Sequence, residues 1–166
     1  MQCQYIRSIQ QPSGHAVSLL ALGPHGDVLL YAAKDNSLHS FTCNHRQVWH
    51  NVPSPSPYHK HAQPPIASVN TCEPLSVLTL NTSGTLLITA GESGAVTLRR
   101  PHDLAVLHTL HAGSEPSPIR SLALSADEQF LLAGTQRGTL LIWGLSTKVI
   151  ARNFLESLDR TLGLSF

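Results

Sequence analysis

The 166-residue sequence has little charge and no long apolar run. Charged residues make up 13% of the chain and the net charge is +1 with histidines neutral. Phosphate binding needs clustered Lys and Arg, so we expect no nucleic acid as a partner. One of the longest apolar runs is the six-residue segment 28–33. A membrane-spanning helix needs about 20 apolar residues, so no transmembrane segment is predicted.

Cysteine is also scarce. The sequence contains only Cys3, Cys43 and Cys72, and an odd, sparse set does not indicate a disulfide framework. Residues 1–11 lack the apolar core of a signal peptide. Together these absences predict a reducing, intracellular compartment.

What the sequence does contain is an internal repeat. Residues 74–100 align with residues 118–144 at an offset of 44, which places Pro74 on Pro118 and Gly94 on Gly138. A weaker copy covers residues 16–44. A period of about 40–45 residues is that of a four-stranded propeller blade.

Each copy is built from short apolar runs of the kind that form strands. The runs are rich in leucine and β-branched residues and are bounded by Gly, Pro, Asn and Ser, which is typical of strands joined by hairpins. No segment has a helical period over several turns. We therefore predict an all-β fold, a partial β-propeller with about three four-stranded blades plus a leading strand.

The segment between the first two copies is rich in proline, which lacks the donor that a sheet ladder needs. It is interpreted as an inserted loop, more simply a tolerated surface insertion than a segment that a partner recognises. The predicted organisation is a last strand of a preceding blade at 1–12, a blade at 13–51, the Pro-rich inserted loop at 52–73, a blade at 74–112, a blade at 113–154, and a tail or closing strand at 155–166.

The three copies resemble WD repeats. The third copy has Trp143-Gly144 where the repeat usually has Trp-Asp. At the same place the second copy has Arg99-Arg100 and the first has Phe41-Thr42. A second resemblance covers nearly the whole chain. The segments GDVLLYAAKDNSLHSFTCN, AGESGAVTLRR and PIRSLALSADEQFLLAGTQRGTLLIW occur in that order. This order resembles the C-terminal WD-repeat β-propeller region of BEACH-domain proteins, the neurobeachin-like group in particular.

The resemblance implies a scaffold for protein–protein interaction that acts in vesicle trafficking and membrane-protein sorting. It implies protein partners, a cytoplasmic location and peripheral association with endomembranes through the full-length protein. The alternative is a generic WD-repeat adaptor subunit unrelated to BEACH proteins. Known propellers typically close with 4–8 blades, so we expect the open blade edges to pair with further repeats.

The sequence carries no motif for catalysis. It has neither a G-x-S-x-G elbow nor a phosphate-binding loop, so we expect neither an enzyme nor a cofactor. A Cys/His zinc site is an alternative, but its spacings match no standard finger, and solvated loop histidines are the simpler interpretation. Its ligands would be Cys43, His45, His59 or His61, and Cys72.

The candidate partner-binding surface rests on arginine, which is favoured at interface hot spots for its planar donor fork. Glu92 and Arg137 lie in corresponding tight turns of the second and third copies, so both turns should open on one face of the propeller. For any single residue, ordinary solvation of a β-turn is the alternative. The predicted residues are Glu92, Arg99, Arg100, Arg120 and Arg137.

Overall fold

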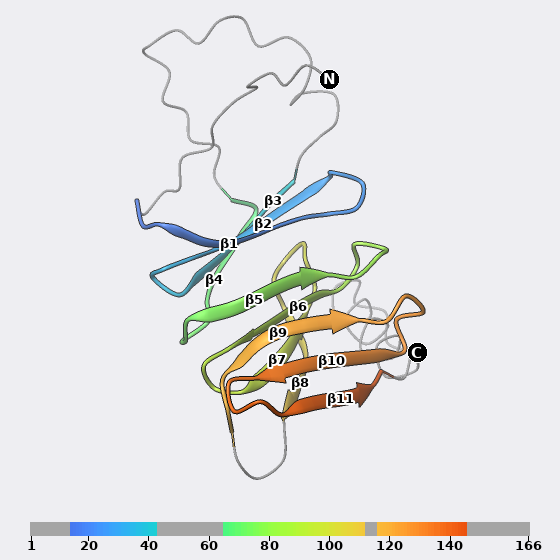
Figure 1. Ribbon diagram of the computed structural model, residues 1–166. Helices are drawn as coiled ribbons and strands as arrows, with labels where there is room; N and C mark the ends of the chain where they lie inside the picture. The colour runs from blue at the N-terminus through green and yellow to red at the C-terminus, as the bar shows by residue number, and fades with distance from the viewer. Residues whose placement is uncertain (1–13, 43–64, 112–115, 146–166) are drawn as a thin grey trace, which may run out of the picture.

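The computed structural model of the chain describes residues 14–42, 65–111 and 116–145, which form three antiparallel sheets (Figure 1). Within each sheet the strands are neighbours in the order of the sequence. Sheet 1 contains β1 (Val17–Leu22), β2 (Val28–Ala33), β3 (Ser37–Thr42) and β4 (Ala67–Asn70). Sheet 2 contains β5 (Leu75–Leu80), β6 (Leu87–Gly91), β7 (Ala95–Arg99) and β8 (Val106–His111). Sheet 3 contains β9 (Ile119–Leu124), β10 (Phe130–Thr135) and β11 (Leu140–Gly144).

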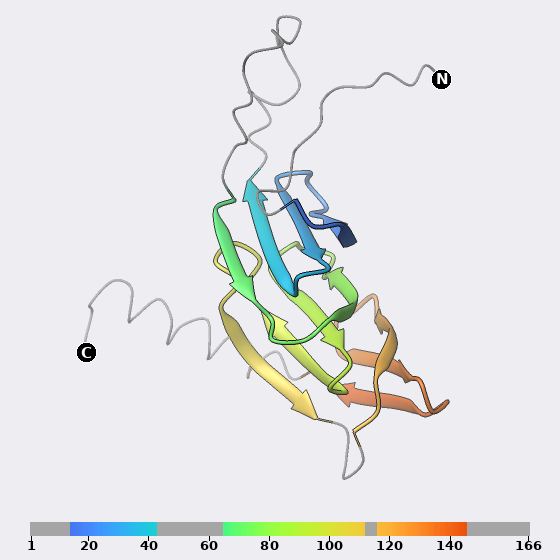
Figure 2. The ribbon, with the colours of Figure 1, turned by 90° about the vertical axis from the view of Figure 1, so that its left-hand side faces the viewer.

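The first strand of each sheet lies innermost. Strand β1 contacts β5, and β5 contacts β9, so consecutive sheets meet along these three strands as blades of one propeller do. Figure 2 shows the sheets following one another along the molecule. The predicted all-β partial propeller is confirmed. Among the described residues there is no helix long and apolar enough to cross a membrane.

The tight turn between the second and third strands recurs in all three sheets. Asn36, Gly94 and Gly138 hold the same place in this turn, with φ values of 63°, 76° and 81°. The left-handed region costs glycine nothing and is tolerated by asparagine. The repeat offset therefore predicted the place of these turns correctly.

The core lies between the sheets, and the middle sheet is buried on both of its faces. All five residues of β6 are buried. Leu87 packs with Leu30 and Leu38 of sheet 1, whereas Ile88 packs with Leu131 of sheet 3. Successive side chains of a strand point to opposite faces, so a strand that is buried throughout, as β6 is, serves two interfaces.

The predicted inserted loop at 52–73 is wrong in part. Residues 67–70 form β4, which pairs with β3 through Ser37 opposite Asn70 and Ser40 opposite Ala67. The first blade therefore takes its fourth strand from beyond the proline-rich segment, and does not end at residue 51. The sequence ASVN is too short to show a strand period. The strand predicted at 1–12, residues 43–64, the end of the third blade and the tail lie outside the described residues.

Candidate recognition surface

Each innermost strand carries a β-bulge near its start. Val17 pairs with Ala33 and Leu19 with Ala32, so Ser18 is the extra residue of β1. The same shift leaves Ser76 unpaired in β5 and Arg120 unpaired in β9. Bulges re-aim a side chain and are treated as built features of a sheet. The repeated bulge thus presents Ser18, Ser76 and Arg120 at equivalent points of the three sheets.

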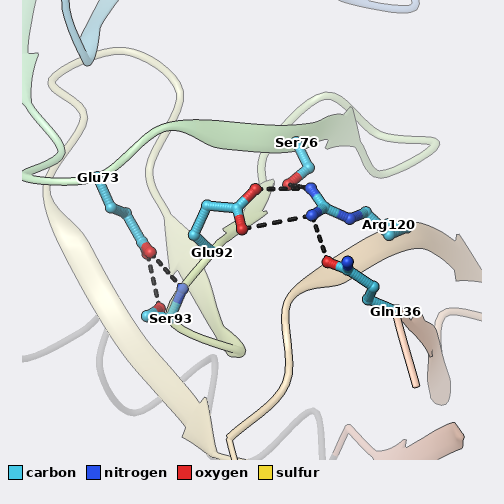
Figure 3. A network of polar contacts seen from close by, with 6 residues as sticks. All are labelled: Glu73, Ser76, Glu92, Ser93, Arg120 and Gln136. Carbon is cyan, nitrogen blue, oxygen red and sulfur yellow. Dashed lines mark hydrogen bonds and ion pairs between the residues drawn. The ribbon is translucent and has the colours of Figure 1, made fainter.

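Arg120 uses this position to join sheets 2 and 3 (Figure 3). Its Nη1 donates to Glu92 Oε1 at 2.6 Å, and its Nη2 donates to Glu92 Oε2 at 3.3 Å. Nη2 also donates to Gln136 Oε1 at 2.5 Å, and Nη1 to the Ser76 hydroxyl at 3.5 Å. One guanidinium therefore contacts the turn between β6 and β7, the turn between β10 and β11, and the neighbouring bulge.

The two turns are equivalent, since Glu92 and Gln136 differ by the repeat offset of 44. The prediction that the turns of Glu92 and Arg137 open on one face is confirmed, because a single side chain bonds both turns. Arg137 is exposed and directly follows Gln136. A role of Arg137 in partner binding stays a prediction.

The ion pair between Arg120 and Glu92 is a surface feature. The two side chains are 44% and 45% exposed, and exposed ion pairs contribute at most about 1 kcal/mol. Its main effect is therefore positional. Four hydrogen bonds fix the guanidinium, and a fixed side chain loses little further freedom when a partner binds.

A second contact holds the same turn from the other side. The Ser93 amide donates to Glu73 Oε2 at 2.5 Å and the Ser93 hydroxyl donates to Glu73 Oε1 at 2.7 Å. Glu73 belongs to the link between sheets 1 and 2, as Figure 3 shows. The turn is thus braced toward both neighbouring sheets.

We call the group formed by these side chains the turn network. The sequence predicted two of its six residues, Glu92 and Arg120, and missed the other four. The repeat offset was the available signal, since it pairs position 76 with 120 and 92 with 136. The turn network consists of Glu73, Ser76, Glu92, Ser93, Arg120 and Gln136.

The prediction of Arg99 as a surface residue is wrong. It is only 9% exposed, and its Nη1 donates to the carbonyl oxygen of Leu104 at 3.1 Å. Arg99 pairs with Leu87 as Trp143 pairs with Leu131, so it occupies the place of the repeat's tryptophan. Burial disfavours its charged form and lowers the pKa of Arg99 below its ordinary value.

Arg100 lies apart from the turn network. Its Nη1 donates to Asp103 Oδ2 at 2.6 Å within the turn between β7 and β8. That turn follows the end of β7, whereas the turn of Glu92 precedes its start. The five predicted residues therefore do not form one surface: Arg100 lies at the opposite end of the sheets and Arg99 lies inside.

Asp35, Ser37 and His39 form a hydrogen-bonded chain in sheet 1. The Ser37 hydroxyl donates to Asp35 Oδ1 at 2.5 Å and lies 2.8 Å from His39 Nε2. In a hydrolase triad the histidine stands between serine and aspartate and takes the serine proton. Here serine stands in the middle and its hydroxyl donates a hydrogen bond to the aspartate, so these contacts brace the turn and activate no nucleophile.

The proposed zinc ligands Cys43, His45, His59 and His61 lie outside the described residues. Cys72 is described and is an exposed free cysteine. Within the described ranges no three His, Cys, Asp or Glu side chains gather to hold a metal ion.

Comparison with known proteins places the chain in a class. A family model for the WD domain, G-beta repeat, matches residues 105–144. The β-propeller domain of Cps50 (Swd1) from Myceliophteria thermophila matches with a TM-score of 0.60 at 18% identity, over 78% of this chain and 40% of that chain. Hsv2 from Kluyveromyces lactis matches with a TM-score of 0.58 at 13% identity, over 81% of this chain and 38% of that chain. The chain is a WD-repeat β-propeller fragment.

A match to one relative indicates the family more narrowly than the repeat does. BEACH domain-containing protein B from Arabidopsis thaliana is 33% identical over 142 residues, which cover 86% of this chain. The chain is therefore homologous to a WD-repeat segment of a BEACH domain-containing protein. It spans about 5% of the length of that relative.

Proposed function

We propose that the chain is the C-terminal WD-repeat part of a BEACH-family scaffold, and that it binds protein partners in vesicle trafficking and membrane-protein sorting. The homology to BEACH domain-containing protein B supports the family context. The observation that carries the binding role is the Arg120 side chain, which bonds turns from two sheets. We further propose a cytoplasmic location, with peripheral association with endomembranes through the full-length protein.

The mechanism is rigid presentation, with no bond made or broken. The turn network offers an arginine donor fork and two carboxylates within one exposed region, and all three are already ordered by hydrogen bonds. A partner that meets preorganised side chains avoids the cost of ordering them. Arginine in such a setting is favoured at binding hot spots.

The test is quantitative recovery of bound proteins by the tagged full chain from cells, with and without Arg120→Ala and Glu92→Ala. The matched control is Arg100→Ala, which breaks an ion pair of the same 2.6 Å N···O distance at the opposite end of the sheets. We expect the first two variants to lose specific partners by about tenfold or more and the control to retain them.

Two results would contradict the proposal in different ways. Equal recovery by all variants would mean that partners do not use the turn network. Recovered partners that never include vesicle or sorting proteins would leave a binding module but remove the trafficking role.

A further inference from the structure

The bulge and turn positions of the repeat carry different side chains at the two junctions between sheets. At the junction of sheets 2 and 3 the bulge residue Arg120 bonds Glu92, the first turn residue after β6. The equivalent residues at the junction of sheets 1 and 2 are Ser76 and Lys34, the first turn residue after β2. Strand β2 contacts β5 as β6 contacts β9, so both junctions arrange these positions alike.

Ser76 lacks the long side chain with which Arg120 joins two turns at the next junction. Its hydroxyl accepts from Arg120 Nη1 at 3.5 Å and donates to no other described residue. The equivalent hydroxyl in sheet 1, that of Ser18, instead donates to the carbonyl oxygen of Ala32 at 3.1 Å. The Ser76 hydroxyl is therefore a donor that the described part of the chain does not use.

Lys34 supplies a second unused donor at the same junction. It is exposed, and its ammonium group makes no hydrogen bond or ion pair with another described residue. Sheets 1 and 2 are both present in the chain, so repeats added at either end would not cover their junction. Nearby carboxylates already accept hydrogen bonds from within the chain. They are those of Asp35, Glu73 and Glu92.

We propose that the junction of sheets 1 and 2 binds an acidic side chain of a protein partner, whose carboxylate accepts hydrogen bonds from the Lys34 ammonium and the Ser76 hydroxyl. A carboxylate fits because it accepts from both donors and carries the charge opposite to that of Lys34. A cationic side chain would be repelled by Lys34, and a neutral amide would leave it without a counter-charge. The Glu92 carboxylate, which would otherwise repel an acidic group, is paired with Arg120. This site rests on the proposed binding role and adds selection of partners by an acidic residue.

The test measures retention of the full chain on immobilised peptide libraries that share random flanking residues and differ in a central glutamate, glutamine or arginine. The variants are Lys34→Glu, which reverses the charge, Lys34→Arg, which keeps it, and Ser76→Ala, which removes the hydroxyl. The matched control is Arg100→Glu, which makes the same reversal of charge at the opposite end of the sheets. Lys34→Gln replaces Lys34→Glu if circular dichroism shows loss of sheet.

The unaltered chain should be retained more strongly by the glutamate library than by the other two. Lys34→Glu should lose this preference by about fivefold or more, because repulsion replaces an exposed ion pair. Ser76→Ala should weaken it, whereas Lys34→Arg and Arg100→Glu should keep it. In an NMR titration of the unaltered chain, the glutamate library should shift the backbone amides of Lys34 and Ser76.

Equal retention by the glutamate and glutamine libraries, or a glutamate preference that survives Lys34→Glu, would overturn the proposal. Recovery of partners from cells separates this failure from that of the proposed function. If Arg120→Ala loses cellular partners and Lys34→Glu keeps them all, the turn network still binds partners, but not through an acidic residue at Lys34. If both variants keep every partner, the binding role of this end of the sheets falls together with the acidic site.

Discussion

At the scale of single residues, Glu128 has an unfavourable backbone conformation whose cost is offset by the hydrogen bonds of its side chain. It has a φ of 59° at a turn position where the other two sheets have Gly26 and Gly84. A side chain in this region costs of order 1 kcal/mol or more. In exchange, its carboxylate accepts bonds from Asn81 Nδ2 at 2.9 Å and from the Thr82 amide at 3.0 Å. These contacts join sheets 2 and 3 at the end opposite the turn network.

Replacing Glu128 separates these two effects. Glu128→Ala removes the bonds and keeps the strained backbone, so we expect a loss of about 1–2 kcal/mol in the free energy of unfolding. Glu128→Gly also removes the bonds but relieves the strain, and should be more stable than the alanine variant by about 1 kcal/mol. Urea unfolding measures both. Equal stability of the two variants would mean that the conformation of Glu128 costs nothing.

His39 gives the fold a dependence on pH. It is buried, and burial lowers the pKa of its imidazole below the ordinary 6.5. The unfolded chain therefore binds more protons than the folded chain between the folded pKa and 6.5. Stability should fall as pH drops through 6.5, and the loss should be complete below the folded pKa.

The measurement is the melting temperature from pH 8 to pH 5 for the unaltered chain and for His39→Asn. We expect the variant to be less stable at pH 8 and to show a smaller loss on acidification. An NMR titration of the His39 ring should give an apparent pKa below 6.5. An unchanged pH slope in the variant would assign the dependence to other groups.

At the scale of strands and turns, most of what the sequence predicted correctly came from the repeat offset. It located the strands and aligned the turns of Gly94 and Gly138, because both depend on local residue types. It missed β4, whose four residues show no period of their own and pair only with a strand on the far side of the proline-rich segment. Strand pairing across such a separation is a tertiary property.

The recognition surface was less predictable than the fold. A β-bulge changes no residue type, so the sequence could not show that Arg120 is re-aimed toward Glu92. Arg99 was misplaced because it was chosen for the planar donor fork that arginine offers at interfaces, without regard to burial. Its alignment with Trp143 already indicated a buried site, and the long apolar stem of arginine allows burial while its Nη1 donates to the carbonyl oxygen of Leu104.

The equivalent turns offer a matched pair of substitutions. Gly94 and Gly138 have φ values of 76° and 81°. A Cβ at Gly94 would lie 2.7 Å from the carbonyl oxygen of Ser117, whereas a Cβ at Gly138 meets nothing within 4 Å. Gly138→Ala should cost about 1 kcal/mol for the backbone alone. Gly94→Ala should cost about 2–3 kcal/mol, because the link before β9 must also move.

Thermal and urea unfolding of these two variants give the comparison directly. The difference between them measures how tightly the link before β9 packs on the turn between β6 and β7. Equal losses would show that this link yields without cost, and the turn network would then be less rigid than the contacts of Ser93 and Glu92 suggest.

At the scale of the whole molecule, the sheets form a row in which consecutive members share a core. One core lies between sheets 1 and 2 and includes Leu38, which is 0% exposed. The other lies between sheets 2 and 3 and includes Leu131, also 0% exposed. Stability in such arrays is approximately a sum of terms for each unit and for each neighbouring interface. A substitution that weakens one core should therefore destabilise the two sheets that share this core more than it destabilises the third sheet.

Hydrogen exchange of Leu38→Ala and Leu131→Ala tests this expectation. Each change should cost about 2–5 kcal/mol at its own interface, since both remove a fully buried leucine. Leu38→Ala should speed amide exchange in β1–β3 more than in β9–β11, and Leu131→Ala should do the reverse. Equal acceleration in all three sheets by both variants would show that the molecule opens as a single cooperative unit.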